Sequence, residues 1–206
     1  HIARCVGDRP TDRLAGPALE AARQQGALLI LAHPQWTGNT FDDALRWPFD
    51  GVAVYNHVCR WLNGKGEAGA YWNAMLRRRP NTLTFAVDDA HLRPEHPGWN
   101  GGWIMVNAAE CTPEQIVSAI RRGNYYASTG PQIHAIRWDG RQVEVETSAV
   151  QFIRLVGPAY LGQRLGSFDG RRLTGARFTL PAEWSYVYLE IEDEQGRRAW
   201  TNTLLT

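Results

Sequence analysis

The chain has 206 residues, of which 44% are apolar and 21% are charged, and its formal net charge is +1. These values are ordinary for a globular chain. They exclude a disordered protein, and they exclude one that binds nucleic acid or an anionic membrane through excess positive charge.

The first half of the chain alternates between helical and strand patterns. Strong helix formers end at Gly26, a residue type common just past a helix, and Thr112-Pro113 is typical of a helix start. Helical patterns cover residues 17–25, 41–47, 67–78 and 112–122. Strand patterns cover residues 27–32, 51–55, 83–87 and 103–106. This alternation predicts an α/β domain with a parallel sheet.

After Tyr125 the chain consists of short β-rich segments separated by Gly, Pro or Asp. Residues 143–146 and 187–191 alternate between apolar and polar side chains, which indicates half-exposed antiparallel strands. We therefore expect a small antiparallel β-sandwich-like domain over residues 130–206, without catalytic groups, after an α/β domain over residues 1–129. The expected strands are residues 133–138, 143–147, 150–156, 176–180, 186–191 and 198–204.

The three cysteines, Cys5, Cys59 and Cys111, are odd in number and far apart in the sequence. They do not resemble a disulfide framework, so we expect a reducing, cytoplasmic compartment. The longest apolar run is far shorter than the ~18 residues of a membrane span, and we expect neither a membrane nor a nucleic-acid partner.

Two of the predicted strands are followed by residues of types that commonly serve as metal ligands. His33 follows the strand at 27–32, and Asp88-Asp89-Ala90-His91 follows the strand at 83–87. Since α/β proteins place their chemistry at the carboxyl ends of parallel strands, we expect His33, Asp89 and His91 to share one rim. Imidazole and carboxylate are ligands of Zn²⁺, Mn²⁺ or Fe²⁺ in hydrolytic sites. Either motif alone is more often a capped turn or a loop histidine, but two at equivalent places favour a metal site.

These motifs together resemble the polymerase-and-histidinol-phosphatase (PHP) metallohydrolases. Their order is similar to that of the carbaryl hydrolase-like branch, which carries a C-terminal β-domain, and the resemblance covers nearly the whole chain. The matching segments are residues 32–34 (Ala-His-Pro), 54–56 (Val-Tyr-Asn), 63–66, 87–91, 101–106, 123–131 and 193–202.

The resemblance implies that residues 1–129 are the C-terminal part of a distorted (β/α)₇ barrel that holds two or three divalent metal ions, Zn, Mn or Fe. It implies that His33, Asp89 and His91 are metal ligands, with His1 beside His33 as a fourth. Asp89 would also accept the proton of an attacking water, which makes it the expected catalytic residue. The implied substrate is a small molecule, either a phosphoester or an ester or carbamate.

The chain departs from the family pattern in two places. The family's N-terminal His-x-His motif, with its following ligands, has no counterpart here, and Ala53 stands where the family usually has Glu. We therefore expect these residues alone to bind metal weakly, and an N-terminal part to restore binding and turnover. One alternative is a non-catalytic remnant that serves as a binding or scaffold module. Another is carbohydrate binding by a surface rich in tryptophan, including Trp36, Trp61, Trp99 and Trp103.

Overall fold

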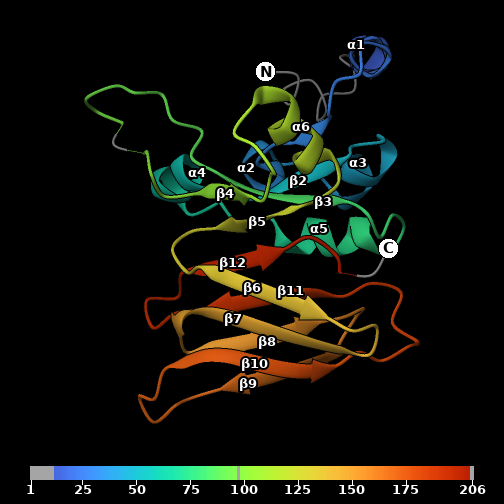
Figure 1. Ribbon diagram of the computed structural model, residues 1–206. Coiled ribbons are helices and arrows are strands. Elements are labelled where there is room, and N and C mark those ends of the chain that lie inside the picture. The colour runs from blue at the N-terminus through green and yellow to red at the C-terminus, as the bar shows by residue number, and fades with distance from the viewer. Residues whose placement is uncertain (1–11, 97, 205–206) are drawn as a thin grey trace. The chain divides into compact units, whose positions relative to one another are not determined.

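The computed structural model describes residues 12–96 and 98–204. The chain forms two compact units that divide between Gly102 and Trp103. Unit 1 contains a parallel sheet with helices between its strands, and unit 2 is mainly antiparallel sheet (Figure 1). The chain is therefore a mixed α/β protein.

Unit 1 is built on a three-stranded parallel sheet. Strands β1 (Ile30–Leu31), β2 (Gly51–Asn56) and β3 (Leu83–Val87) pair in the order β1-β2-β3. The central strand β2 is buried at every position, as expected for a parallel strand that is covered on both faces. The helices of this unit are α1 (Asp12–Gln24), α2 (Pro34–Thr37), α3 (Phe41–Arg46), α4 (His57–Asn63) and α5 (Gly69–Leu76).

Local signals explain two of these helices. The Thr40 hydroxyl accepts from the backbone N–H of Asp43, and the Asp43 carboxylate accepts from that of Thr40, so α3 begins at a reciprocal cap. Helix α5 packs on β2 and buries Trp72. The Trp72 indole N–H donates to the Thr82 carbonyl at 2.8 Å, which satisfies its polar atom inside the core. Among the described residues no helix is both long and apolar enough to cross a membrane.

Unit 2 contains two antiparallel sheets, one of six strands in the order β4-β5-β12-β11-β8-β9 and one of three in the order β10-β7-β6. Helix α6 (Pro113–Arg121) connects β4 to β5 and begins at Thr112, whose hydroxyl accepts from the backbone N–H of Gln115. The strands are β4 (Trp103–Val106), β5 (Tyr125–Ser128), β6 (Ile133–Trp138), β7 (Gln142–Val150), β8 (Phe152–Val156), β9 (Gly162–Gly166), β10 (Leu173–Thr179), β11 (Tyr188–Glu192) and β12 (Arg198–Thr201).

The apolar faces of these two sheets enclose the core of unit 2. Val143 and Val145 of β7 belong to the same buried cluster as Leu155 of β8 and Leu189 of β11. The alternation of buried and half-buried positions along β7 confirms the period-2 prediction for this strand. Unit 2 therefore consists of two antiparallel sheets with a shared core.

The (β/α)₇ barrel expected for the first half is not shown. The described part of the chain has three strands paired in parallel, too few to close a barrel. The next strand of the expected barrel, β4, pairs antiparallel with β5 and belongs to the six-stranded sheet of unit 2.

The boundary between the units lies earlier than the one expected between residues 129 and 130. Strand β5 pairs with β12, with Ala127 opposite Trp200. The Asn202 side-chain amide donates to the backbone carbonyls of Gly123 and Tyr125 at 3.0 and 3.1 Å. These contacts join residues 103–128 to the C-terminal strands, so unit 2 begins at Trp103.

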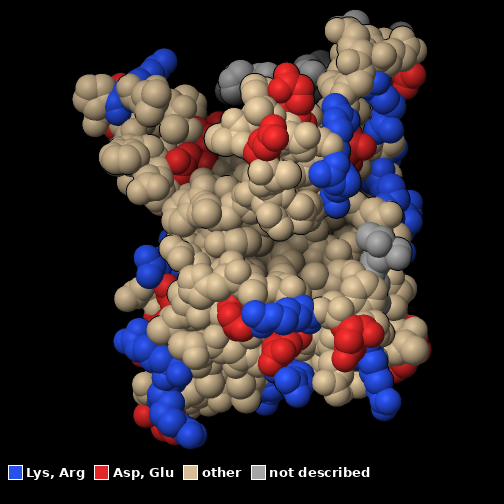
Figure 2. All heavy atoms as spheres, viewed as in Figure 1, with Lys and Arg blue, Asp and Glu red and all other residues tan. Residues whose placement is uncertain are grey.

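The polar faces of unit 2 carry charges of both signs. On the face seen in Figure 2, Lys and Arg lie interspersed with Asp and Glu over the lower part, which Figure 1 shows to be β-rich. Several are bonded across strands, such as Arg154, which donates to Glu190 and Glu192 at 2.8 and 2.7 Å. Such pairs contribute little to stability individually, and they leave no patch of a single sign there.

The sandwich core makes one prediction about stability. Leu155→Ala should lower the free energy of unfolding by about 2–5 kcal/mol, because Leu155 is fully buried and its loss leaves a cavity. The matched control is Leu165→Ala on the neighbouring strand β9, where the side chain is 42% exposed, with an expected loss of about 0.5 kcal/mol. Urea unfolding measures both. Equal losses would contradict a core enclosed between the two sheets.

Candidate functional site

The carboxyl ends of β1, β2 and β3 meet at one edge of the sheet of unit 1, because the strands are parallel. The segment after β1 supplies His33, β2 ends in Asn56, and Asp88 and Asp89 follow β3. In α/β proteins this edge is where ligands and catalytic groups are placed.

A bulge in β2 sets the position of Asn56. Ala53 lies opposite Phe85, but Tyr55 lies opposite Ala86, so Val54 is the extra residue of the pair. The Val54 carbonyl instead accepts from the backbone N–H of Ala68 at 2.8 Å. A bulge of this kind changes the direction of the side chains that follow it. Here the extra residue, Val54, precedes Asn56 by two positions.

His33 is held by the backbone that precedes α2. Its φ of 32° and ψ of 54° lie in the left-handed region, and its carbonyl accepts from the backbone N–H groups of Trp36 and Thr37 at 3.0 and 3.1 Å. Its imidazole is only 11% exposed and meets the edge of the Trp36 ring with centroids 5.4 Å apart. The ring is therefore packed in place, and its backbone adopts a conformation that β-carbon sterics disfavour.

The His33 imidazole faces the carboxylate of Asp89. The distance from His33 Nε2 to Asp89 Oδ2 is 3.6 Å, which is longer than a hydrogen bond. Asp89 also has a left-handed backbone, with φ of 56°, and its side chain is 30% exposed. His33 Nδ1 is buried and has no hydrogen-bond partner among the described residues.

This pair suits a shared divalent ion as two of its ligands. Nitrogen and oxygen ligands bound at about 2.0–2.2 Å to one tetrahedral ion lie about 3.4 Å apart, which is close to the observed 3.6 Å. Within residues 12–96 and 98–204, no group of three or more His, Cys, Asp and Glu side chains is placed to hold a metal. Among the described residues, His33 and Asp89 therefore form a pair and not a complete set of metal-binding side chains.

Asn56 connects Asp89 to the start of α4. Its Nδ2 donates to Asp89 Oδ2 at 3.1 Å, and its Oδ1 accepts from the backbone N–H of Cys59 at 2.9 Å. The side chain is buried, so both of these bonds are made away from bulk water. Asn56 thus orients the carboxylate of Asp89 and caps α4 with the same amide.

Asp88 has a different role from its neighbour. Its carboxylate accepts from the backbone N–H groups of Asn100, Gly101 and Gly102, at 2.6, 2.8 and 2.8 Å. These bonds tie the segment after β3 back to the strand end. Gly101 is required there, because a β-carbon would overlap the ring of His57. The carboxylate of Asp88 therefore binds backbone N–H groups, whereas that of Asp89 faces the imidazole of His33.

The other two predicted ligands are placed differently. His91 is exposed, and its ring contacts that of His96 with centroids 5.3 Å apart. His96 in turn contacts Trp61 at 5.5 Å. His91 is not grouped with His33 and Asp89 as a metal cluster in the described part of the chain, so its role as a ligand stays a prediction. His1 lies outside the described residues.

Two further groups near this edge were not assigned roles from the sequence. Cys59 is buried, and this burial, together with the charge of Asp89, raises the pKa of its thiol to about 11. The Tyr55 hydroxyl lies 3.0 Å from His57 Nδ1, which fixes the ring beside Gly101. Tyr55 directly precedes Asn56 and Cys59 follows three residues later, so the position of Asn56 at the end of a strand was the available signal.

No protein-family model and no curated protein match the chain. Among solved structures it is similar to a two-domain protein containing a predicted PHP-like metal-dependent phosphoesterase from Bacteroides vulgatus ATCC 8482. The identity is 15% and the TM-score is 0.42, and the match covers 92% of this chain and 66% of that chain, just under two thirds of its length. The function proposed below therefore depends on the residues of this chain.

The double role of Asn56 predicts a loss of stability. Asn56→Ala should lower the free energy of unfolding by about 1–3 kcal/mol, because it removes a helix cap and leaves buried groups unpaired. Asn56→Asp keeps an acceptor for the backbone of Cys59 but opposes Asp89 with a second carboxylate, so it separates the two contributions. Chemical unfolding measures both, and Asn63→Ala at the exposed end of α4 is the control. Equal stability of the alanine variants would contradict this role.

The buried thiol predicts selective alkylation. At pH 8 the rise in the Cys59 pKa from 9.0 to about 11 lowers its thiolate fraction about a hundredfold, and burial also blocks access. Iodoacetamide should therefore label the exposed Cys111 well before Cys59 in the folded protein, and both alike in urea. Peptide mass spectrometry distinguishes the two sites. Rapid labelling of Cys59 in the folded chain would show that this edge is open.

Proposed function

We propose that this chain carries part of the active centre of a divalent-metal-dependent hydrolase of the PHP type. The observation that supports the proposal is the pair formed by His33 and Asp89, 3.6 Å apart at the carboxyl edge of a parallel sheet. Both residues belong to segments whose sequence resembles that family, and so does Asn56, which orients Asp89.

Each residue has a defined part in this proposal. His33 Nε2 and Asp89 Oδ2 would hold a Zn, Mn or Fe ion, with His91 and His1 proposed as further ligands. A bound ion of this kind lowers the pKa of water to about 7 and polarises a phosphoryl or carbonyl oxygen. Asp89 Oδ1 has no hydrogen-bond partner among the described residues, so it is free to accept a proton from an attacking water. Asn56 keeps Oδ2 directed toward His33.

The proposed substrate is a small phosphoester, or an ester or carbamate. All three present a polarised oxygen next to an electrophilic phosphorus or carbon, and all three are hydrolysed by metal-assisted attack of water. The cytoplasmic location expected from the cysteines stays a prediction.

The proposal predicts that two substitutions weaken metal binding. Asp89→Asn and His33→Gln should each lower the affinity for Mn²⁺ and Zn²⁺ at least about tenfold, because each removes a ligand or its charge. Calorimetric titration of the purified chain measures the affinity. Hydrolysis of p-nitrophenyl phosphate and of an aryl carbamate, assayed on the same samples, should fall with it.

Two exposed residues provide matched controls. His134→Gln on β6 and Asp42→Asn on α3 change the same residue types at exposed positions and should leave metal affinity unchanged. Affinity that survives both Asp89→Asn and His33→Gln would contradict the metal centre. Affinity that depends on them, without hydrolysis of either substrate, would favour the non-catalytic binding module over the enzyme.

A further inference from the structure

The sheet of unit 1 has a second edge, formed by the amino ends of its parallel strands. Asp50 precedes β2, and its carboxylate accepts from the backbone N–H of Leu29, just before β1, at 2.7 Å. The Asp50 carbonyl accepts from the backbone N–H of Leu83, the first residue of β3, at 2.8 Å. His33 and Asp89 lie at the carboxyl edge, so the length of the strands separates them from Asp50.

Two arginine side chains meet at the segment that precedes β2. Arg23, in the last turn of α1, donates to the carbonyl of Pro48. Arg79, which follows α5, donates from Nη2 to the carbonyl of Trp47 at 3.3 Å. Because these carbonyls belong to consecutive residues, the two guanidinium groups lie close together. A guanidinium has several N–H donors in a planar fork, so both groups retain donors for a ligand.

The described carboxylates do not balance the positive charge of this group. Arg78 and Arg79 form no ion pair within the part of the chain that the structure describes. The charges that act on Arg79 are those of Arg23, Arg78 and Asp50. The Asp50 carboxylate is itself engaged by the backbone, and its Oδ1 lies 3.8 Å from Arg23 Nη2. Three guanidinium groups and one carboxylate leave a net charge of +2.

Arg79 is the member of this group that is held most firmly. The backbone N–H and the hydroxyl of Thr82 both donate to the Arg79 carbonyl, at 3.0 and 2.7 Å. Burial lowers the pKa of the Arg79 guanidinium, and although Asp50 raises this pKa, the like charges of Arg23 and Arg78 lower it further. An anion that reached this partly buried cation would relieve the repulsion between the three guanidinium groups.

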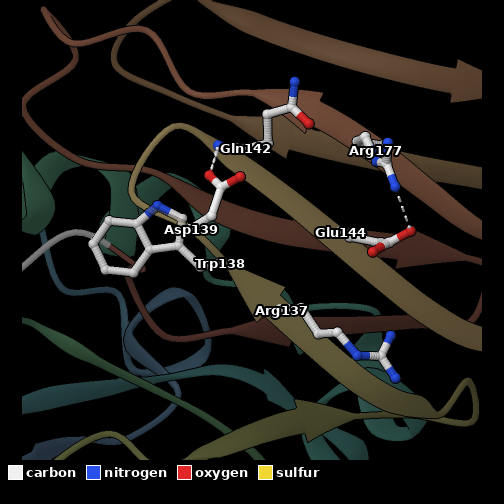
Figure 3. Close-up of a pocket in the computed structure, with 6 residues that line it drawn as sticks. All are labelled: Arg137, Trp138, Asp139, Gln142, Glu144 and Arg177. Carbon is white, nitrogen blue, oxygen red and sulfur yellow. Dashed lines mark hydrogen bonds and ion pairs between the residues drawn. The ribbon is translucent and has the colours of Figure 1, made fainter.

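The arginines on the three-stranded sheet of unit 2 are arranged differently. Figure 3 shows Arg177 directed at Glu144, to which it donates at 3.0 Å. Arg137 pairs with Glu146, which lies on the same strand β7 as Glu144. A carboxylate therefore neutralises both of these positive charges. Helix dipoles favour cations at the ends of α1 and α5, but a dipole does not require two guanidinium groups to meet at one segment.

We infer that Arg23, Arg78 and Arg79 bind a phosphate group, either free phosphate or the end of a monoester. A phosphate carries a charge of about −1.5 to −2 at pH 7 and three acceptor oxygens, which guanidinium forks bind in pairs. The net charge of the arginine group suits this ligand. The inference goes beyond the proposed hydrolase and does not depend on it, because the arginines lie at the other edge of the sheet.

Titration of the full chain tests the inference. The protein is treated with a chelator, so that no metal ion contributes, and is titrated with sodium phosphate, phenylphosphonate or sodium chloride at matched ionic strength. Calorimetry should give a saturable heat with phosphate, and the melting temperature should rise with phosphate but not with chloride. Phenylphosphonate stands for a monoester that water does not cleave. Tighter binding of phenylphosphonate would identify an esterified ligand, and tighter binding of phosphate would identify the free anion.

Three variants make the outcome decisive. Arg78→Gln and Arg79→Gln should each weaken the affinity for phosphate at least about tenfold, because each removes a charged donor. Arg78 is exposed, so its variant keeps the test valid even if Arg79→Gln proves unstable. The matched control is Arg93→Gln, which removes another exposed arginine of unit 1, after β3, and should leave the affinity unchanged.

Three results would overturn the inference. The first is a wild-type chain with no saturable phosphate binding. The second is phosphate affinity that survives both Arg78→Gln and Arg79→Gln. The third is an equal loss of affinity in Arg93→Gln, which would reveal attraction by overall charge in place of a site.

Discussion

The parallel pairing of β1, β2 and β3 is the constraint on which the candidate site depends. Because the three strands run the same way, the residues that follow them arrive at one edge, although His33 and Asp89 are far apart in sequence. The bulge at Val54 then shifts the register between β2 and β3 just before Asn56. The hydrogen bond from Asn56 to Asp89 exists because of both features. If β1 or β3 ran in the opposite direction, the imidazole of His33 and the carboxylate of Asp89 would lie at opposite edges of the sheet.

The adjacent carboxylates of Asp88 and Asp89 have different hydrogen-bond donors around them. Asp88 accepts three backbone N–H groups, which engage both of its carboxylate oxygens. Asp89 receives a single amide donor and turns its charge toward His33 and, across the cap of α4, toward Cys59. A carboxylate with acceptor capacity left over, in a partly buried position, is the one with affinity for a cation or a proton. The structure thus separates Asp88, which holds the loop, from Asp89, the residue that we propose as a metal ligand.

Local patterns in the sequence predicted much of this arrangement, and non-local pairing accounts for most of what they missed. The strands at 51–55 and 83–87 and the residues after them were predicted because burial, turn residues and strand length are local properties. Residues 103–122 were predicted as a further strand and helix of the α/β domain, yet β4 pairs antiparallel with β5, and β5 pairs with β12. No pattern within that segment encodes its partner. For the same reason the sequence did not predict the hydrogen bond between Asn56 and Asp89, which are 33 positions apart. Helices α2 and α4 were also missed, because four and seven residues show too little periodicity.

His33 and Asp89 share a strained backbone, and neighbouring parts of the fold compensate for it. His33 and Asp89 both have positive φ, which costs about 1–3 kcal/mol at each non-glycine residue. For His33 the compensation comes from α2, whose first turn bonds its carbonyl, and from the Trp36 ring. For Asp89 it comes from Asn56, which is itself fixed by α4. These contacts hold the two side chains 3.6 Å apart. Side chains that their own fold holds in place lose less freedom when a ligand binds, so an ion bound as proposed would gain affinity from this arrangement.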